Sequence, residues 1–209
     1  MPAPETIAVF ALASLALIVF PGPSVFYILA RSFAGGRRAG LVSMLGVEAG
    51  GLVHVTAATL GLSALLASSA VAFGVVKYAG AAYLIWLGIS RLRSREAPEL
   101  PAPARDGQVF RQGVMVNVLN PKTALFFLAF LPQFIDPDAG SASLQAALLG
   151  LVFVAIAFVS DGLYALVGGS VAERIRRSPA VRRRLDRASG AVLIGLGAVA
   201  ALTGSRHTA

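Results

Sequence analysis

The stretch "VNVLNPKTALFFLAFLPQF", residues 116–134, is apolar enough to cross a membrane, yet it carries an Asn-Pro-Lys triplet near its middle. A second stretch, "LIVFPGPSVFYILA", residues 17–30, is apolar on both sides of a Pro-Gly-Pro triplet. Proline removes a backbone donor and interrupts a helix, and a charged side chain is costly in lipid. The two stretches therefore predict membrane helices that are broken at depth.

Composition places the whole chain among membrane proteins. Of its 209 residues 56% are hydrophobic and only 13% are charged, against roughly 25% charged residues in a soluble domain. The charges are bunched between long apolar runs, which is typical of a polytopic membrane protein. The chain contains no cysteine, so disulfides, thiol chemistry and cysteine metal sites are excluded.

A formal net charge of +8 raises the question of nucleic acid as a partner. The arginines lie only between the apolar runs, where the positive charge of cytoplasmic loops explains them. No nucleic-acid partner is therefore expected, whereas the basic cytoplasmic loops are expected to contact anionic lipids. Arg31 and Arg111 stand at the ends of apolar runs, where snorkelling to the membrane surface accounts for them.

Apolar segments of about 20 residues are long enough to span a bilayer as helices. The sequence contains six, at 5–30, 39–66, 72–89, 110–134, 144–170 and 185–203. The first lacks the basic start of a signal peptide, so it is expected to remain as a membrane helix. The loops after the first, third and fifth segments, together with Arg111 and Arg187 at the starts of the segments that follow, hold 15 of the 18 Lys and Arg residues. Positive loops stay in the cytoplasm, which predicts that both termini lie outside.

The Pro-rich linker around "SREAPELPAPARDGQ", residues 94–108, divides the spans into two groups of three. We predict a first repeat at 1–91, a cytoplasmic linker at 92–109 and a second repeat at 110–209. Because three is odd, the second repeat enters the membrane inverted. The similarity of "GAAYLIWLG" (80–88) to "GAVLIGLG" (190–197) supports this division. The expected fold is an all-α polytopic membrane protein, with six transmembrane helices in an inverted 3+3 repeat and a broken first helix in each half.

Paired broken helices in an inverted repeat are the best sequence-level indication of a transporter's binding site. A kink that serves packing alone is the alternative for either break, but two breaks in matching places favour function. The starts of the half-helices would offer N–H groups to an anion such as a carboxylate. The predicted substrate-binding residues are those of the two breaks: Pro21, Gly22, Pro23, Asn120, Pro121 and Lys122.

Three ionisable residues, Glu48, Lys122 and Asp161, fall well inside predicted spans. Each costs at least about 2.5 kcal/mol at the bilayer centre unless it is paired or hydrated, so a functional role is the default interpretation. A Lys122 ion pair that only holds helices together is the alternative. Asp161 and Tyr164 share one helix face. Glu48, Asp161 and Tyr164 are therefore candidates for proton coupling or for binding an ammonium group.

The second predicted span carries a stripe of small residues suited to close helix packing: Gly46, Gly50, Ala57 and Gly61. Between a structural role and a proton role for His54, which lies on this stripe, we favour hydrogen bonding or packing. The stripe is also compatible with a homo-oligomer, although packing within one chain is the commoner use.

Three segments together resemble the LysE/RhtB-type amino-acid exporters: "PGPSVFYIL", "KYAGAAYLIWLGI" and "FRQGVMVNVLNPKTALFFLAFLPQFI". The resemblance covers nearly the whole chain apart from the Pro-rich linker and the C-terminal tail. It implies a bacterial inner-membrane transporter that exports amino acids or close derivatives by proton antiport, with no cofactor. It does not select among lysine and arginine, threonine and homoserine, or leucine-like substrates.

In the resulting hypothesis, the two breaks and Lys122 hold the substrate carboxylate, while Glu48 or Asp161 holds the ammonium group or exchanges a proton. Burial favours the protonated form of a carboxyl group, so a proton can compete with substrate. The alternatives are a passive channel and a transporter of another small solute. An intramembrane enzyme is not expected, because the spans contain neither an H-E-x-x-H motif nor a G-x-S-x-G elbow.

Overall fold

The computed structural model describes residues 1–68, 70–93 and 104–202, which form helices and turns without a strand. The helices are α1 (Pro4–Val19), α2 (Pro23–Ser68), α3 (Ala70–Arg93), α4 (Asp106–Val118), α5 (Pro121–Leu125), α6 (Ala142–Arg177) and α7 (Pro179–Leu202). After α5 follow a π-helical turn and two 3₁₀ turns: η1 (Phe126–Phe130), η2 (Leu131–Phe134) and η3 (Pro137–Ala139). The helical fold agrees with the all-α prediction.

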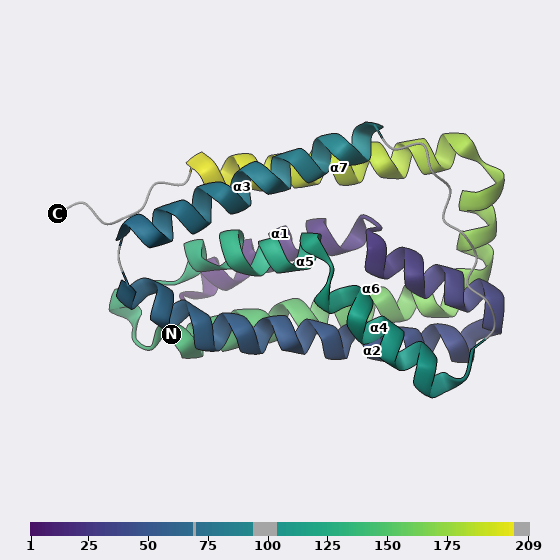
Figure 1. The fold of residues 1–209 in the computed structure, drawn as a ribbon, viewed down its shortest axis with the longest axis horizontal. Helices are drawn as coiled ribbons and strands as arrows, with labels where there is room; N and C mark the ends of the chain where they lie inside the picture. Colours follow the sequence, from purple (N-terminus) through teal and green to yellow (C-terminus); the bar gives the residue numbers. More distant parts are fainter. Residues whose placement is uncertain (69, 94–103, 203–209) are drawn as a thin grey trace.

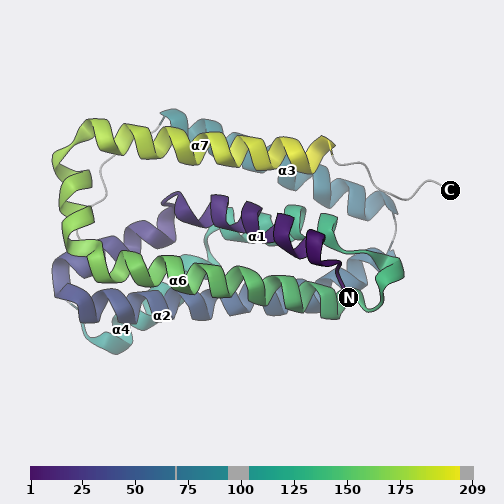
Figure 2. The same ribbon diagram turned by 180° about the vertical axis from the view of Figure 1, so that it is seen from behind.

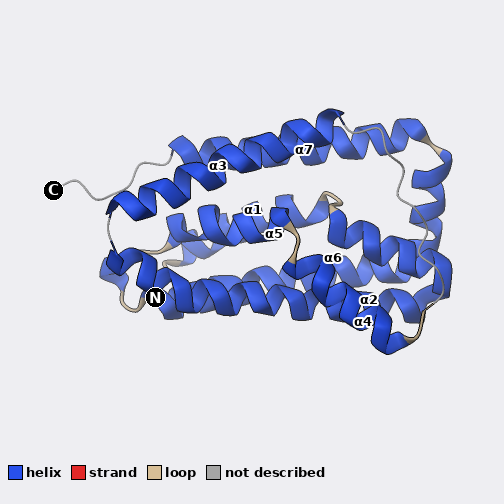
Figure 3. Cartoon of the chain, viewed as in Figure 1, coloured by secondary structure: helices blue, strands red, loops and turns tan. Residues whose placement is uncertain are grey.

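Most of the helices lie roughly along one long axis, and the last turns of α6 cross one end of the molecule to reach α7 (Figures 1 and 2). α2 and α6 run side by side along one flank, and α4 packs against α2. α3 and α7 form a pair along the opposite flank, and α1 and α5 lie between the two flanks. Loops are confined to short connections between helices in the described part of the chain (Figure 3).

Both predicted breaks are present. The first predicted span is divided between α1 and the start of α2, with residues 20–22 between them, and the fourth is divided between α4 and α5 at residues 119–120. The two halves of the fourth span meet at a bend of 43°. A proline stands at the start of each second half, Pro23 in α2 and Pro121 in α5. Proline suits the first helical position, where its missing N–H has no intrahelical partner.

Among the described residues, two helices are long and apolar enough to cross a membrane, namely Pro23–Gly61 and Ala142–Gly168. The bent pair of Asp106–Val118 with Pro121–Phe134 makes a third if it counts as one span. Pro4–Val19 and Gly190–Val199 are shorter apolar helices. Six spans thus remain a prediction, as do the inverted repeat and the division at 92–109. Residues 94–103 of that linker lie outside the described residues.

α2 combines the end of the first predicted span with the whole of the second. The two parts meet at Gly36, whose φ of 73° and ψ of −172° depart from helical values. Only glycine adopts such a conformation without strain. Figure 1 shows the chain reversing here, so that the later part of α2 runs back along the molecule.

The small residues of α2 pack closely against α4, as predicted for part of the stripe. A Cβ added to Gly46 would lie 2.2 Å from the Phe110 carbonyl oxygen, and one on Gly50 would lie 2.8 Å from the Val114 oxygen. A Cβ on Gly61 would meet no atom within 4 Å. The close packing therefore ends before Gly61, and it holds the second part of α2 against α4.

A cluster of phenylalanines fills the space between α1, η1 and α6. Phe126 contacts Phe10, Phe130 and Phe153 with ring centroids 5.0–5.6 Å apart. Phe127 contacts Phe153 edge to face at 5.1 Å. The π-helical turn η1 supplies three of these rings, so the irregular turn after the second break is anchored by the core.

Arg31 corrects one expectation, since it does not snorkel to the membrane surface. Its side chain is buried, donates to Gln112 Oε1 and lies over the ring of Tyr27. The Tyr27 hydroxyl in turn donates to the Val109 carbonyl at 2.7 Å. These contacts join the start of α2 to α4, so Arg31 is an interhelical contact.

Candidate functional site

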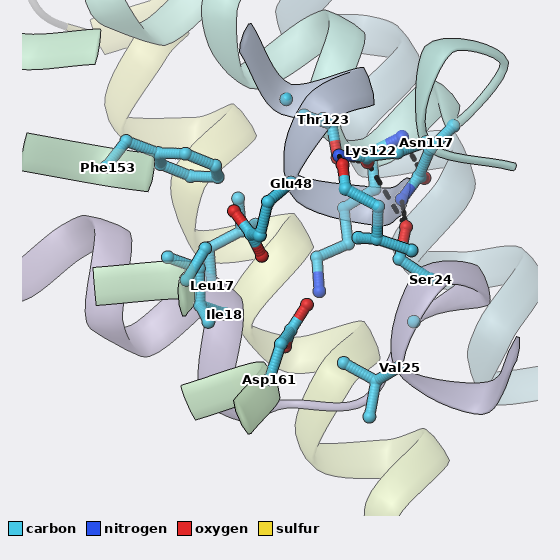
Figure 4. A pocket seen from close by; sticks show the side chains of 15 residues that line it. Leu17, Ile18, Ser24, Val25, Glu48, Asn117, Lys122, Thr123, Phe153 and Asp161 are labelled. Atoms are coloured by element: carbon cyan, nitrogen blue, oxygen red, sulfur yellow. Dashed lines mark hydrogen bonds between the residues drawn. The ribbon is translucent and has the colours of Figure 1, made fainter. Parts of the chain in front are cut away.

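A small cavity lies where the two helix breaks face α6 and the second part of α2 (Figure 4). The volume of the cavity that is accessible to the centres of water molecules is about 40 Å³. This is room for a few water molecules. Its lining is half apolar and half polar: Leu17, Ile18, Gly22, Ser24, Val25, Val47, Glu48, Gly51, Asn117, Asn120, Lys122, Thr123, Phe153, Ala157 and Asp161.

The first break leaves the last carbonyl groups of α1 without helical partners, as every helix end does. Side chains from distant helices satisfy two of them. The Tyr164 hydroxyl of α6 donates to the Val19 carbonyl at 2.7 Å, and Lys122 Nζ of α5 donates to the Phe20 carbonyl at 2.9 Å. The first break is thus stabilised by tertiary contacts.

The second break is capped by its own residues. Asn120 is the N-cap of α5, and its side-chain oxygen accepts from the backbone N–H of Lys122 at 3.1 Å. The Thr123 hydroxyl donates to Asn117 Oδ1 at 3.0 Å, which ties the start of α5 back to the end of α4. Asparagine at an N-cap and proline at the next position are both favoured there, so the sequence itself specifies this geometry.

Ser24 links the two breaks directly. Its hydroxyl donates to Asn117 Oδ1 at 3.1 Å and accepts from Asn120 Nδ2 at 2.9 Å. Asn117 Nδ2 also donates to the Val47 carbonyl at 2.7 Å. The amide of Asn117 therefore connects both breaks with the second part of α2.

Glu48, Lys122 and Asp161 come from three different helices and meet in this cavity (Figure 4). Each side chain is at most 8% exposed. Figure 4 shows the Lys122 ammonium group pointing toward Asp161, with Glu48 lining the same cavity. Glu48 Oε1 and Asp161 Oδ1 are buried and, in the described part of the chain, have no hydrogen-bond partner. The cavity therefore combines one cation with two acids that can accept further donors.

The structure brings most of the predicted site residues together. Five of them line the cavity: Gly22, Glu48, Asn120, Lys122 and Asp161. Pro21, Pro23 and Pro121 shape the breaks but do not line the cavity. Tyr164 is also outside the lining and contacts the end of α1 instead. Its observed contact is structural, whereas a proton role remains untested.

Sequence reasoning did not identify three polar residues of the site, Ser24, Asn117 and Thr123. All three are buried and line the cavity. A usable signal was present for Asn117, because a second amide within an apolar segment commonly makes hydrogen bonds between helices. Its partners, however, come from parts of the chain 70 and 93 positions away and cannot be read from one sequence.

His54 has a structural environment. Its Nε2 lies 2.9 Å from the Asn117 carbonyl oxygen, and its ring stacks on Phe127 at 6.0 Å. It does not line the cavity. These contacts agree with the interpretation of His54 as a hydrogen-bonding and packing residue. Among the described residues, no group of three or more His, Cys, Asp or Glu side chains could hold a metal ion.

Comparison with known proteins shows which family the sequence matches and which proteins it is similar to. The family model described as LysE type translocator matches residues 15–204. The homoserine/homoserine lactone efflux protein of Salmonella typhimurium is 32% identical over 201 residues, covering 95% of this chain and 96% of that protein.

Two further relatives are comparably similar. An uncharacterized membrane protein of Vibrio cholerae is 33% identical, over 90% of this chain and 92% of its own length. The leucine efflux protein of Klebsiella pneumoniae is 28% identical, over 87% and 88% respectively. No solved structure is significantly similar to the chain.

Proposed function

This chain belongs to the LysE type translocator family, and on that premise we propose that it exports amino acids or close derivatives across the bacterial inner membrane in exchange for protons. The observation that carries the proposal is the cavity between the two breaks, where one ammonium group and two carboxyl groups lie beside apolar side chains. A zwitterionic amino acid needs both kinds of charge, and few other small solutes do.

The substrate carboxylate is assigned to the two breaks and Lys122. The first N–H groups of a helix have no intrahelical acceptor and carry the positive end of its dipole. Ser24 and Val25, in the first turn of α2, line the cavity together with Lys122. An anion placed here is therefore held by backbone donors and by a cation.

The substrate ammonium group and the coupling proton are assigned to Glu48 and Asp161. Both acids have a buried oxygen able to accept a hydrogen bond. A proton and an ammonium group compete for the same carboxylates, so binding of one favours release of the other. This competition couples export to the inward proton gradient.

A neutral side chain fits this cavity better than a charged one. Leu17, Ile18 and Phe153 are the largest apolar side chains of the lining. The named functions of the two efflux relatives, for homoserine or its lactone and for leucine, involve uncharged side chains. We therefore place the substrate among neutral amino acids and their close derivatives. Since the cavity has room for only a few water molecules here, substrate enters a wider conformation.

The arrangement of the helices supports six spans in an inverted repeat. The turn at Gly36, the start of α4 and the junction of α6 with α7 lie at one end of the molecule, whereas α1 begins at the other end (Figures 1 and 2). The basic segments at 31–38 and 105–111 lie at the first of these ends, which we place in the cytoplasm. The two breaks occupy corresponding places in the two halves.

Access to the cavity alternates, in this proposal, between two closed ends. On the cytoplasmic side, Arg31 and Tyr27 of α2 bond to Gln112 and Val109 of α4. On the outer side, the phenylalanine cluster around Phe126 packs α1 against η1 and α6. Rocking of one three-helix unit against the other would open these contacts in turn.

Transport in vesicles tests the function directly. The purified chain is reconstituted into inside-out vesicles with an acidic lumen, and each of the twenty amino acids plus homoserine is added outside while a dye reports luminal pH. The expected result is a saturable rise in luminal pH with neutral amino acids. Vesicles without protein control for leakage. A linear, unsaturable response would indicate a passive channel, and no response from folded protein would contradict amino acid–proton exchange.

A further inference from the structure

The side chain of Lys122 does not stay at the break from which it comes. It starts in the first turn of α5, at the second break, and crosses to the first break, where Nζ donates to the Phe20 carbonyl at 2.9 Å. Figure 4 shows the ammonium group pointing toward Asp161. The end of a helix carries the negative end of its dipole, so this position attracts a cation.

Gly22 provides the space that the lysine occupies. A Cβ added to Gly22 would lie 3.2 Å from both Cδ and Nζ of Lys122 and 3.7 Å from Cε. The glycine of the first break thus leaves a groove along which the last three atoms of the lysine side chain lie. The two sequence motifs are complementary, since one supplies the groove and the other supplies the side chain that fills it.

The groups around this position suit a primary ammonium ion, which has three N–H donors and no acceptor. The Phe20 carbonyl accepts from the ammonium group, and Figure 4 shows the Asp161 carboxyl group facing it. In the described part of the chain, Glu48 Oε1 and Asp161 Oδ1 are buried without a partner and can accept donors. In transporters with broken helices, freed carbonyls of this kind coordinate a coupling cation. Here a primary ammonium group of the protein itself is in that place.

We propose that the Lys122 ammonium group occupies, as a tethered cation, the site in which the α-ammonium group of the substrate binds. The site is made by the Phe20 carbonyl and the Asp161 carboxylate, and the ligand class that fits it is a primary alkylammonium ion. Arriving substrate displaces Lys122 from the site, and the released lysine then meets the substrate carboxylate. This last step rests on the proposed function, whereas the existence of the site does not.

Two substitutions of Lys122 distinguish the effect of emptying the ammonium site from the effect of losing the lysine charge. Lys122→Ala removes three carbons and the nitrogen, which together correspond to n-propylammonium, and leaves their space empty. Lys122→Met also removes the charge but fills the space with an apolar chain of similar length. Thermal unfolding of the detergent-solubilised full chain is followed with and without n-propylammonium, and 1-propanol serves as the uncharged probe.

We expect n-propylammonium to raise the unfolding midpoint of Lys122→Ala saturably, by about 3 °C or more, and 1-propanol to leave it unchanged. The wild type and Lys122→Met should not respond, because their sites are filled. No saturable shift in folded Lys122→Ala, or equal shifts in all three proteins, would overturn the proposal. If Lys122→Ala is recovered only when n-propylammonium is present, that supports the site, and failure in both conditions counts against it.

This outcome is independent of the vesicle experiment. Saturable binding without amino acid transport would leave the tethered-cation site standing and reject the function. Amino acid transport without binding of n-propylammonium would reject the tethered-cation site and leave the proposed function standing.

Discussion

The two helix breaks look equivalent in sequence, but they are stabilised in different ways. The second break, at 119–120, is closed locally, since Asn120 caps α5 and Thr123 bonds back to Asn117. The first break, at 20–22, depends on Tyr164 and Lys122, which come from α6 and α5. Local bonds persist when helices move relative to one another, whereas contacts between helices can exchange partners.

Because of this difference, we expect the two breaks to have different roles in transport. The second break is suited to be a fixed scaffold that presents Lys122 and the amides of Asn117 and Asn120. The first break is suited to change, because its caps are side chains of moving parts. The four substitutions below test this division, and they are arranged from the largest expected effect to the smallest.

Asn117→Ala should have the largest effect, on stability. The amide makes three buried side-chain bonds, to Ser24, Val47 and Thr123. At about 1 kcal/mol each, their loss should lower the free energy of unfolding by about 3 kcal/mol. Denaturant unfolding in detergent measures it, and Gln133→Ala, whose amide donates to the Ala129 carbonyl in its own turn, is the matched control. A loss below about 1 kcal/mol would mean that this network does not hold the second break.

Asp161→Asn should abolish coupling while leaving both breaks in place. Asparagine has nearly the same shape but neither carries a proton nor balances Lys122, so proton-driven export should fall at least about 100-fold, equivalent to about 2.7 kcal/mol. The vesicle assay measures it, with Glu48→Gln alongside to decide which acid carries the proton. Glu5→Gln, at an exposed position in α1, is the control. Full proton-coupled export by Asp161→Asn would remove this acid from the mechanism.

Gly22→Ala should disturb the first break alone. The new methyl group would crowd Lys122 at 3.2 Å and shift the lysine away from the Phe20 carbonyl. The same methyl group would crowd the substrate ammonium group that takes this position, so we expect export to fall about tenfold, equivalent to about 1.4 kcal/mol. Gly195→Ala, where an added Cβ meets no atom within 4 Å, should transport normally. Equal rates for both variants would show that the groove beside Lys122 is not needed.

Tyr164→Phe should give the smallest change. It removes the hydroxyl that bonds to the Val19 carbonyl, and we expect a loss of about 1 kcal/mol in unfolding free energy with export reduced less than threefold. Tyr83→Phe, on the exposed face of α3, is the matched control. A loss of coupling as large as that of Asp161→Asn would instead assign Tyr164 the proton role predicted from the sequence.

Sequence patterns predicted the helices and their breaks better than they predicted where one helix ends and the next begins. The Pro-Gly-Pro and Asn-Pro-Lys triplets located both breaks because proline acts on the backbone turn in which it stands. The boundary between the first two predicted spans was less clear, since α2 runs from Pro23 through Gly36 to Ser68. A single glycine with positive φ makes the reversal there, and the charged residues around it suggested a longer loop.

The residues of the candidate site were likewise predicted only in part. Glu48, Lys122 and Asp161 stood out because charge is costly in an apolar span. Arg31 was assigned to the membrane surface because it ends an apolar run, but it is buried against Gln112 and Tyr27. Ser24 and Thr123 were not identified, since hydroxyl groups in membrane helices are common and usually serve packing.

The sequence alone determined that the chain is helical, apolar, broken at two places and ionisable at three positions within apolar segments, because these properties depend on backbone chemistry and on the cost of placing charge in lipid. Only the tertiary structure decided which groups meet. That Lys122 leaves its own break to lie beside Gly22, and that Asn117 joins both breaks through Ser24, depends on close packing between helices far apart in the chain. Such contacts are set by the packed geometry of several helices at once, and no local pattern encodes them.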